Sequence, residues 1–376
     1  MDSLIDHNIM RKVVGVRPGS LVLVIPVAFA LIWLAAWGGP TAPPTATWVP
    51  QADGLILYNR AEYIPQSVLD AFTDEYGVKV TYLTYASQEE AVANIEKGEV
   101  YDVAIIKNEH ILSLAEEGLL AEIDYGNVPN FSNISADLRD LGYDRGNKYS
   151  IPFSWGTTGL VVRSDLVDKP VTRWADLWDP RYRGRVGLRG GSMREAIGAA
   201  LKSLGYSVNS ENPDELDAAL VRLLALKSGV VFVHTHTEGA VPRMLNGDVA
   251  IMVGWAEDVI WGRAENDAIT FVFPEEGVFV WGDNLVIPAN SPHKASAELF
   301  LNFLLRPEVS GQIASQNYYS TANEKAYPFI DSELLKDRVA FPTKESLKNA
   351  EVLMPLSVEG RNSYEEIWGQ FMAAQP

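Results

Sequence analysis

The sequence predicts an α/β protein with mostly parallel strands, and three observations lead to this prediction. Short apolar runs alternate with helical segments over most of the chain. Such alternation is typical of parallel strands joined by crossover helices. The composition is that of a globular protein, with 47% hydrophobic and 21% charged residues. A length of 376 residues is enough for two domains with cores of their own.

The first block of elements begins after residue 53. Its apolar patterns predict strands and helices in turn, with strands over residues 55–58, 78–82 and 103–106 and helices over residues 66–76 and 88–97. Gly77 directly follows the first of these helices, and glycine is the residue that most often ends a helix.

The same alternation returns in a second block. Its predicted strands cover residues 160–162, 186–188, 230–233 and 249–253, and its predicted helices cover residues 174–177, 192–204 and 214–225. The chain then turns back with a strand-like run over residues 284–287. An amphipathic helix over residues 294–305 ends at Arg306 and Pro307, since proline cannot continue a helix.

The N-terminus indicates export. Residues 1–20 carry basic side chains and are expected to stay in the cytoplasm, because they precede an apolar run over residues 21–37. This run is either a cleaved signal peptide or a retained transmembrane anchor, and its length is at the lower limit for a membrane span. Residues 38–52 are rich in proline and are expected to form an extended linker. The domain that follows is therefore expected in the periplasm or elsewhere outside the cytoplasm.

Composition and motifs exclude several classes of function. The formal net charge of -18 argues against nucleic-acid binding. The absence of cysteine excludes disulfides, thiolate metal sites and a lipid-modified cysteine anchor. The sequence contains no phosphate-binding loop, no nucleophile elbow and no zinc-protease motif. We therefore expect no enzyme activity and no cofactor.

Two polar segments leave alternatives open. His234 and His236 could share one face of a strand and hold a metal ion, but a polar loop is the simpler interpretation, and we predict no metal site. Ser192 begins a helix that could receive an anion at its free N–H groups. Ser192 and Glu195 also match a capping box, in which they would satisfy that helix end themselves.

Two tryptophans suggest a site for an organic cation. Trp255 is followed by acids at positions 257 and 258, and Trp281 is followed by Asp283. Aromatic faces beside carboxylates attract ammonium groups through the ring quadrupole and through charge. The alternative is that both tryptophans fill the core.

Several stretches, in order along residues 54–370, resemble the bacterial spermidine/putrescine-binding proteins. The most specific is VTRWADLW at residues 171–178, followed by Pro180, Tyr182 and Gly184. The others are YN at 58–59, EYIP at 62–65, NFSN at 130–133, YSIPFSWG at 149–156, WGD at 281–283, IPAN at 287–290 and NFLLRP at 302–307.

The resemblance implies a two-lobed periplasmic-binding-protein fold of the type II kind, with discontinuous lobes joined by hinge crossovers. Lobe 1 would comprise residues 53–155 and 282–323, and lobe 2 residues 159–279 and 328–376. The crossovers would be residues 156–159, residues 280–281 and the segment near Lys325. A solute bound between the lobes would favour their closed state, and a membrane permease with a cytoplasmic ATPase would accept it.

The resemblance also implies a set of ligand-binding residues. Six positions match the family's pocket: Tyr63, Glu195, Thr237, Trp255, Trp281 and Asp283. The aromatic side chains would line the methylene chain of a polyamine, the two acids would pair with its ammonium groups, and Thr237 would hydrogen-bond. This assignment also makes the segment from His234 to Glu238 a loop of the cleft.

Four positions depart from the family pattern. Arg60 replaces an aromatic wall, Lys107 and Glu109 replace a hydroxyl and a tyrosine, and Ser192 replaces a carboxylate. Such changes disfavour a polycation, because like charges repel in a closed cleft. The ligand therefore stays open between a polyamine and a zwitterionic or anionic metabolite. A membrane-tethered sensor that feeds no transporter is a further alternative.

Overall fold

The computed structural model describes residues 54–189, 193–233 and 240–375. The predicted membrane segment and linker lie outside these residues. Within them, no helix is both long enough and apolar enough to cross a membrane. The described chain forms a mixed α/β structure around one sheet with the strand order β2-β1-β3-β9-β4-β7-β5-β6.

The first half of the structure contains the helices α1–α3, α8 and α9 around three parallel strands. The strands are β1 (Gly54–Asn59), β2 (Lys79–Thr84) and β3 (Val103–Lys107). The helices are α1 (Gln66–Tyr76), α2 (Gln88–Glu96), α3 (Asn108–Glu116), α8 (Lys294–Leu304) and α9 (Pro307–Asn317). The predicted end of α1 is confirmed: Gly77 has φ 70° and donates its N–H to the carbonyl of Thr73 at 2.8 Å.

The second half is built on the same plan. Its strands are β5 (Val186–Arg189), β6 (Val230–Val233), β7 (Ile251–Trp255) and β8 (Ile269–Val272). Its helices are α4 (Met193–Ser203), α5 (Pro213–Leu226), α6 (Ala240–Asn246), α7 (Ala256–Glu265) and α10 (Val358–Ala373). Asn212 caps α5 by accepting a hydrogen bond from the backbone N–H of Asp214, which explains why this helix starts as predicted.

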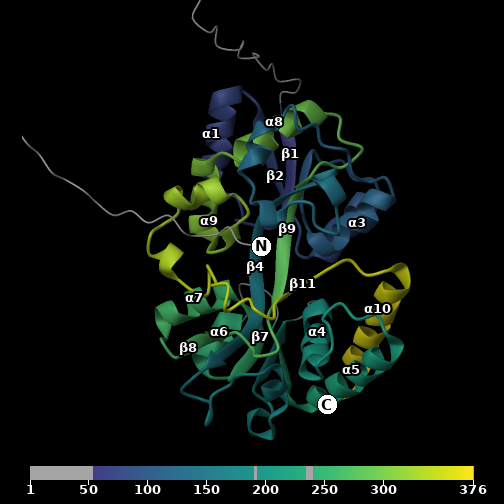
Figure 1. The fold of residues 1–376 in the computed structure, drawn as a ribbon, viewed down its shortest axis with the longest axis vertical. Helices are drawn as coiled ribbons and strands as arrows, with labels where there is room; N and C mark the ends of the chain where they lie inside the picture. The colour runs from purple at the N-terminus through teal and green to yellow at the C-terminus, as the bar shows by residue number, and fades with distance from the viewer. Residues whose placement is uncertain (1–53, 190–192, 234–239, 376) are drawn as a thin grey trace, which may run out of the picture. The chain divides into compact units, whose positions relative to one another are not determined.

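Two long strands join the halves. β4 (Ser150–Arg163) and β9 (Phe279–Val286) pair antiparallel over most of their length, with Gly156 opposite Trp281. In Figure 1, α1, α3 and α8 lie toward one end of this pair, and α4–α7 and α10 lie toward the other. β4 and β9 also receive the short strands β10 (Ser320–Thr321) and β11 (Glu351–Val352).

The strand pair corrects the lengths of two predicted strands. The apolar pattern predicted strands only over residues 160–162 and 284–287, whereas β4 begins at Ser150 and β9 begins at Phe279. The part of β4 that was not predicted, residues 150–159, contains two glycines and four Ser or Thr residues. It carries little local signal for a strand, and its conformation comes from pairing with a distant partner.

Each half has its own apolar core. In the first half, side chains of β1, β3, α2 and α3 pack together, including Tyr58, Ile106 and Ile111. In the second half, Val161 of β4 packs with Met244 and Met252. Between the two cores, strand ends and loops of both halves meet, and the residues there are polar.

Candidate functional site

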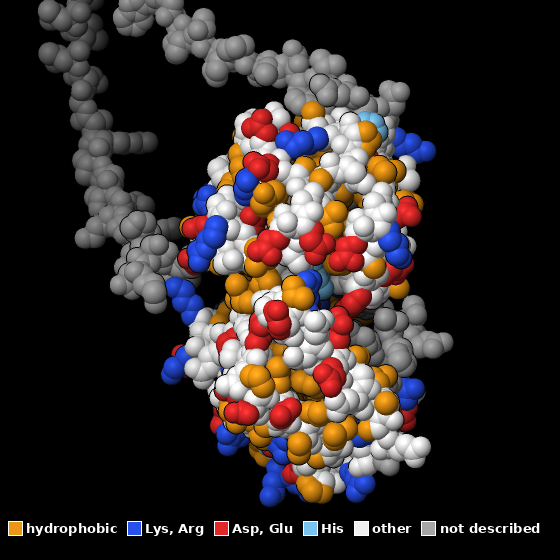
Figure 2. All heavy atoms as spheres, turned by 90° about the vertical axis from the view of Figure 1, so that its right-hand side faces the viewer, with side chains coloured by type: hydrophobic (Ala, Val, Ile, Leu, Met, Phe, Trp, Pro, Cys, Tyr) orange, Lys and Arg blue, Asp and Glu red, His pale blue; other side chains and the backbone are white. Residues whose placement is uncertain are grey.

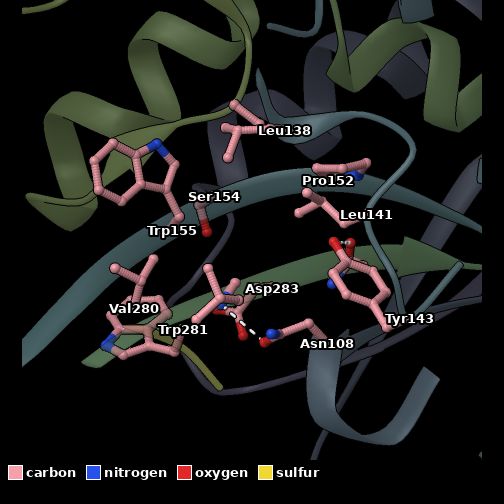
Figure 3. Close-up of a pocket in the computed structure, with 14 residues that line it drawn as sticks. Asn108, Leu138, Leu141, Tyr143, Pro152, Ser154, Trp155, Val280, Trp281 and Asp283 are labelled. Carbon is pink, nitrogen blue, oxygen red and sulfur yellow. Dashed lines mark hydrogen bonds between the residues drawn. The ribbon is translucent and has the colours of Figure 1, made fainter. Parts of the chain in front are cut away.

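The candidate site lies where the two halves meet, along the β4–β9 pair. Figure 2 shows a hollow at this level, with acidic side chains along both of its edges. Figure 3 shows how Trp281 and Asp283 lie on β9, near Ser154 of β4 and Asn108 at the start of α3. Asn108 accepts a hydrogen bond from the backbone N–H of Gly282 at 3.0 Å, which fixes β9 between the two side chains that the sequence singled out.

Asp283 is held from two sides by residues of the loop after β1. Its Oδ2 accepts hydrogen bonds from Arg60 Nη2 at 2.8 Å and from Tyr63 Oη at 2.7 Å. Asp283 is 1% exposed, so this is a nearly buried ion pair. The loop turns through Glu62 in the left-handed region, with φ 59°, and this turn lets both side chains reach Asp283.

The electrostatics of this cluster follow from burial and from the ion pair. Burial is the largest single effect and opposes the charge of Arg60, but the Asp283 carboxylate and the nearby tyrosines together raise the pKa of the guanidinium above its ordinary value. Burial, together with the same carboxylate, also raises the pKa of Tyr63. Arg60 is therefore a permanent cation, and Tyr63 is a neutral hydrogen-bond donor.

Glu195 in the first turn of α4 has a different environment. Its Oε1 accepts hydrogen bonds from Thr158 Oγ1 at 2.9 Å and from Trp255 Nε1 at 2.7 Å. Its Oε2 is buried and has no hydrogen-bond partner among the described residues, and the residue is 3% exposed. The two donors are uncharged, so this carboxylate is buried without a cation from the described part of the chain.

Trp255 owes its position to a strand-to-helix junction. It is the last residue of β7 and directly precedes α7, and its backbone N–H donates to Asp258 Oδ2 at 2.8 Å. The Trp255 ring lies 6.0 Å from that of Trp281, and Lys107 Nζ lies 5.4 Å from the centre of the Trp255 ring. Lys107 comes from the end of β3, so this contact links the two halves.

Tyr319 belongs to the same cluster, although the sequence analysis did not select it. Its ring meets that of Trp281 edge-on at 4.9 Å, and its hydroxyl donates to Glu257 of the second half. Burial raises the pKa of Tyr319, and the Glu257 carboxylate raises it further. No local pattern could have found Tyr319, because its two partners lie in distant parts of the chain.

The structure brings most of the predicted residues together. Tyr63, Arg60 and Asp283 form one group, and Glu195, Trp255 and Lys107 form another around Trp281. Ser192 and Thr237 lie outside the described residues, as does the segment from His234 to Glu238. The capping-box alternative for Glu195 depends on Ser192, so it stays a prediction. Among the described residues, no group of three His, Asp or Glu could hold a metal ion.

Glu109 and His110 adjoin the site at the start of α3. His110 Nε2 lies 3.8 Å from Glu109 Oε1, and their side chains are 20% and 10% exposed. Burial would raise the pKa of Glu109, but the charges of Lys107, His110 and Arg194 bring it below its ordinary value. Burial lowers the pKa of His110, although Glu109 and Glu89 act against this.

The lowered pKa of His110 predicts a pH dependence of stability. Below about pH 6.5 the unfolded chain binds a proton at His110 that the folded chain accepts only at lower pH. The free energy of unfolding should therefore fall as the pH drops from 7 to 5, by at most about 1.4 kcal/mol per pH unit. His110→Gln should make this fall smaller, as measured by urea unfolding at pH 7, 6 and 5. An equal fall in both proteins would contradict the prediction.

Comparisons with known proteins show the family of this chain. A family model described as bacterial extracellular solute-binding protein matches residues 67–343. The spermidine/putrescine-binding periplasmic protein of Escherichia coli is 38% identical over 300 residues, which is 79% of this chain and 85% of the relative. A putrescine/agmatine-binding protein of Pseudomonas aeruginosa is 29% identical and covers 85% of this chain and 92% of its own length.

Two solved structures support the fold. The spermidine/putrescine ABC transporter substrate-binding protein PotD of Streptococcus pneumoniae has a TM-score of 0.75 and 33% identity, over 85% of this chain and 99% of that one. The TpPotD lipoprotein of Treponema pallidum has a TM-score of 0.76 and 26% identity, over 85% and 99% of the two chains. The α/β architecture described above is therefore of the periplasmic-binding-protein kind.

Proposed function

Because the chain belongs to the family of bacterial extracellular solute-binding proteins, we propose that it captures a small amine-bearing solute, the class that includes the polyamines, between two lobes. The family is one of binding components rather than of enzymes. In the proposal, the loaded protein docks on a membrane permease whose ATPase drives import. The lobes are those expected from the sequence, residues 53–155 with 282–323 and residues 159–279 with 328–376.

The buried carboxylate of Glu195 is the observation that carries this proposal. A charged group in a low-dielectric site is costly unless an opposite charge meets it. Glu195 Oε2 has no hydrogen-bond partner among the described residues, Trp255 donates to the other oxygen of this acid, and the Trp281 ring lies 6.0 Å from the Trp255 ring. An ammonium group at Oε2 would gain charge pairing from Glu195 and ring contacts from the tryptophans.

The names of the relatives support the class of solute and the location. The relative in Escherichia coli is named for binding spermidine and putrescine and as a periplasmic protein. The relative in Pseudomonas aeruginosa is named for binding putrescine and agmatine. These names support an extracytoplasmic location for this chain and an amine as its solute. A tether through residues 21–37 remains part of the proposal.

The proposal predicts that an amine will bind and compact the protein. Calorimetry with spermidine, putrescine, agmatine and monoamines should give saturable binding for at least one amine. Small-angle scattering of the same samples should then give a smaller radius of gyration, because closure of the lobes brings their masses together. The hinge would be residues 156–159 of β4 with Val280 and Trp281 of β9.

A salt control separates specific binding of an amine from a general effect of ionic strength. Sodium chloride at equal ionic strength should change neither the heat nor the radius of gyration. Saturable binding without compaction would contradict the clamp, and the absence of binding by every amine would contradict the proposed class of solute.

A further inference from the structure

Asp283 and Glu195 differ in their partners, and we infer that the site takes a solute with a single ammonium group, because Arg60 already occupies the cation position at Asp283. The inference rests on the proposed function, since it assigns the class of solute at the same site. It makes Arg60 a specificity-determining residue. The favoured solute has an uncharged or acidic group at its other end.

The first step concerns Asp283. The Arg60 guanidinium is 2.8 Å from Asp283 Oδ2, its side chain is 17% exposed, and it also lies 4.7 Å over the Tyr63 ring. A ligand ammonium at Asp283 would either displace Arg60 or stand beside it. If the ligand ammonium group displaces Arg60, the guanidinium is left unpaired in a nearly buried environment. If the ammonium group binds beside Arg60, two positive charges lie close together and repel. Both outcomes disfavour a second ammonium group at this acid.

The second step concerns Lys107. β3 and β9 pair with Lys107 opposite Asp283, and cross-strand partners carry their side chains on the same face. Lys107 Nζ lies over the ring of Trp255, the residue whose indole N–H holds Glu195. A solute that extends from Glu195 along this ring therefore approaches a protein ammonium group. A cationic far end is repelled there, whereas an uncharged or acidic one is not.

The third step compares the partners of three acids, Asp283, Glu109 and Glu195. Asp283 is paired with Arg60, and Glu109 lies in the field of Lys107, which helps to keep its pKa below the ordinary value. Glu195 accepts only from the hydroxyl of Thr158 and the indole of Trp255, and its Oε2 is buried without a described partner. Of these three acids, Glu195 is the one that has no cation of the described chain beside it, and it is therefore the acid that can pair with an ammonium group of the solute.

The experiment uses three probes with the same four-carbon spacing: putrescine, 4-amino-1-butanol and 4-aminobutanoate. Calorimetry with the full-length protein should show that at least one singly ammonium-bearing probe binds about tenfold or more tightly than putrescine. Arg60→Gln should shift this ratio toward putrescine by about tenfold or more, because Asp283 becomes free to pair with a second ammonium group. Arg60→Lys retains the charge and should retain the preference.

A double variant tests whether the gain depends on Asp283. Adding Asp283→Asn to Arg60→Gln should abolish the gain for putrescine, since the freed acid is then absent. Thermal unfolding of all variants identifies any that are not folded, and the comparison of three probes within each folded protein does not depend on its stability.

Three results would overturn the inference. They are tighter binding of putrescine than of both other probes by the unaltered protein, an unchanged ratio in Arg60→Gln, and no binding of any probe by either protein. A different result would contradict the proposed function, namely that no amine of the wider panel binds. Putrescine preferred by the unaltered protein would support the proposed function while removing Arg60 as the determinant.

Discussion

Glu195→Gln is expected to weaken binding of an amine-bearing solute by about 30-fold or more. Loss of one partner from a buried charge pair costs about 2–5 kcal/mol, and 2 kcal/mol corresponds to about 30-fold in affinity. Glutamine has the size of glutamate and keeps an oxygen for Thr158 Oγ1 and Trp255 Nε1, which now donate to Oε1 at 2.9 Å and 2.7 Å. The change therefore removes the charge and little else.

The helix position of Glu195 requires a control. An acid in the first turn stabilises a helix by about 0.3–1 kcal/mol through the helix dipole, so Glu195→Gln should also lower the stability of the protein slightly. Glu359→Gln is the matched control, because Glu359 is an exposed acid in the first turn of α10 and makes none of the contacts of the site described above. It should leave binding unchanged. Equal affinity of the unaltered protein and Glu195→Gln for every amine would exclude Glu195 as the ammonium partner.

Gly156→Ala is expected to disturb both stability and binding. A Cβ at this position would lie 2.3 Å from Cζ2 of Trp281 and within 2.9 Å of two further ring atoms. Trp281 is 2% exposed and packs against Tyr319 at 4.9 Å, so its ring cannot move without disturbing the cluster. Overpacking of this kind costs about 1–3 kcal/mol, and displacement of Trp281 should weaken solute binding by about tenfold.

Gly369→Ala is the matched control for this change. Gly369 lies within α10, and an added Cβ would contact nothing within 4 Å. Alanine favours a helix over glycine by about 1 kcal/mol, so this variant should be as stable as the unaltered protein or more stable. Urea unfolding and calorimetry compare the two variants. A fully stable Gly156→Ala protein with unchanged affinity would show that the Trp281 ring is free to move.

Elements with local signals could be predicted from the sequence, whereas the contacts of the site could not. The predicted helix over residues 66–76 coincides with α1, because its apolar periodicity and Gly77 lie in adjacent residues. The ion pair between Arg60 and Asp283 joins residues 223 positions apart. From the sequence, Arg60 could be interpreted only as a charge that repels a cationic ligand, since its partner depends on how β9 pairs with β3.

The resemblance to known binding proteins predicted which distant residues form the site, and hydrophobic periodicity could not predict this. It placed Glu195, Trp255 and Trp281 near one another, and in the structure these side chains come together through α4, β7 and β9. It did not select Thr158 or Tyr319, whose importance comes from hydrogen bonds to Glu195 and Glu257. Contacts of this kind follow from packing between distant segments, and no short stretch of sequence encodes them.

The place of β9 between β3 and β4 has a consequence for the newly synthesised chain. Until β9 exists, β3 has a free edge whose neighbour, in the register of Lys107 with Asp283, has not yet been made. At ~5–20 residues per second, synthesis from β3 to β9 takes roughly 10–40 s. The all-apolar stretch Val103–Ile106 is an aggregation-prone strand edge during that interval. A chaperone that binds extended apolar segments should therefore protect the chain at β3 until residues 279–286 are able to pair with it.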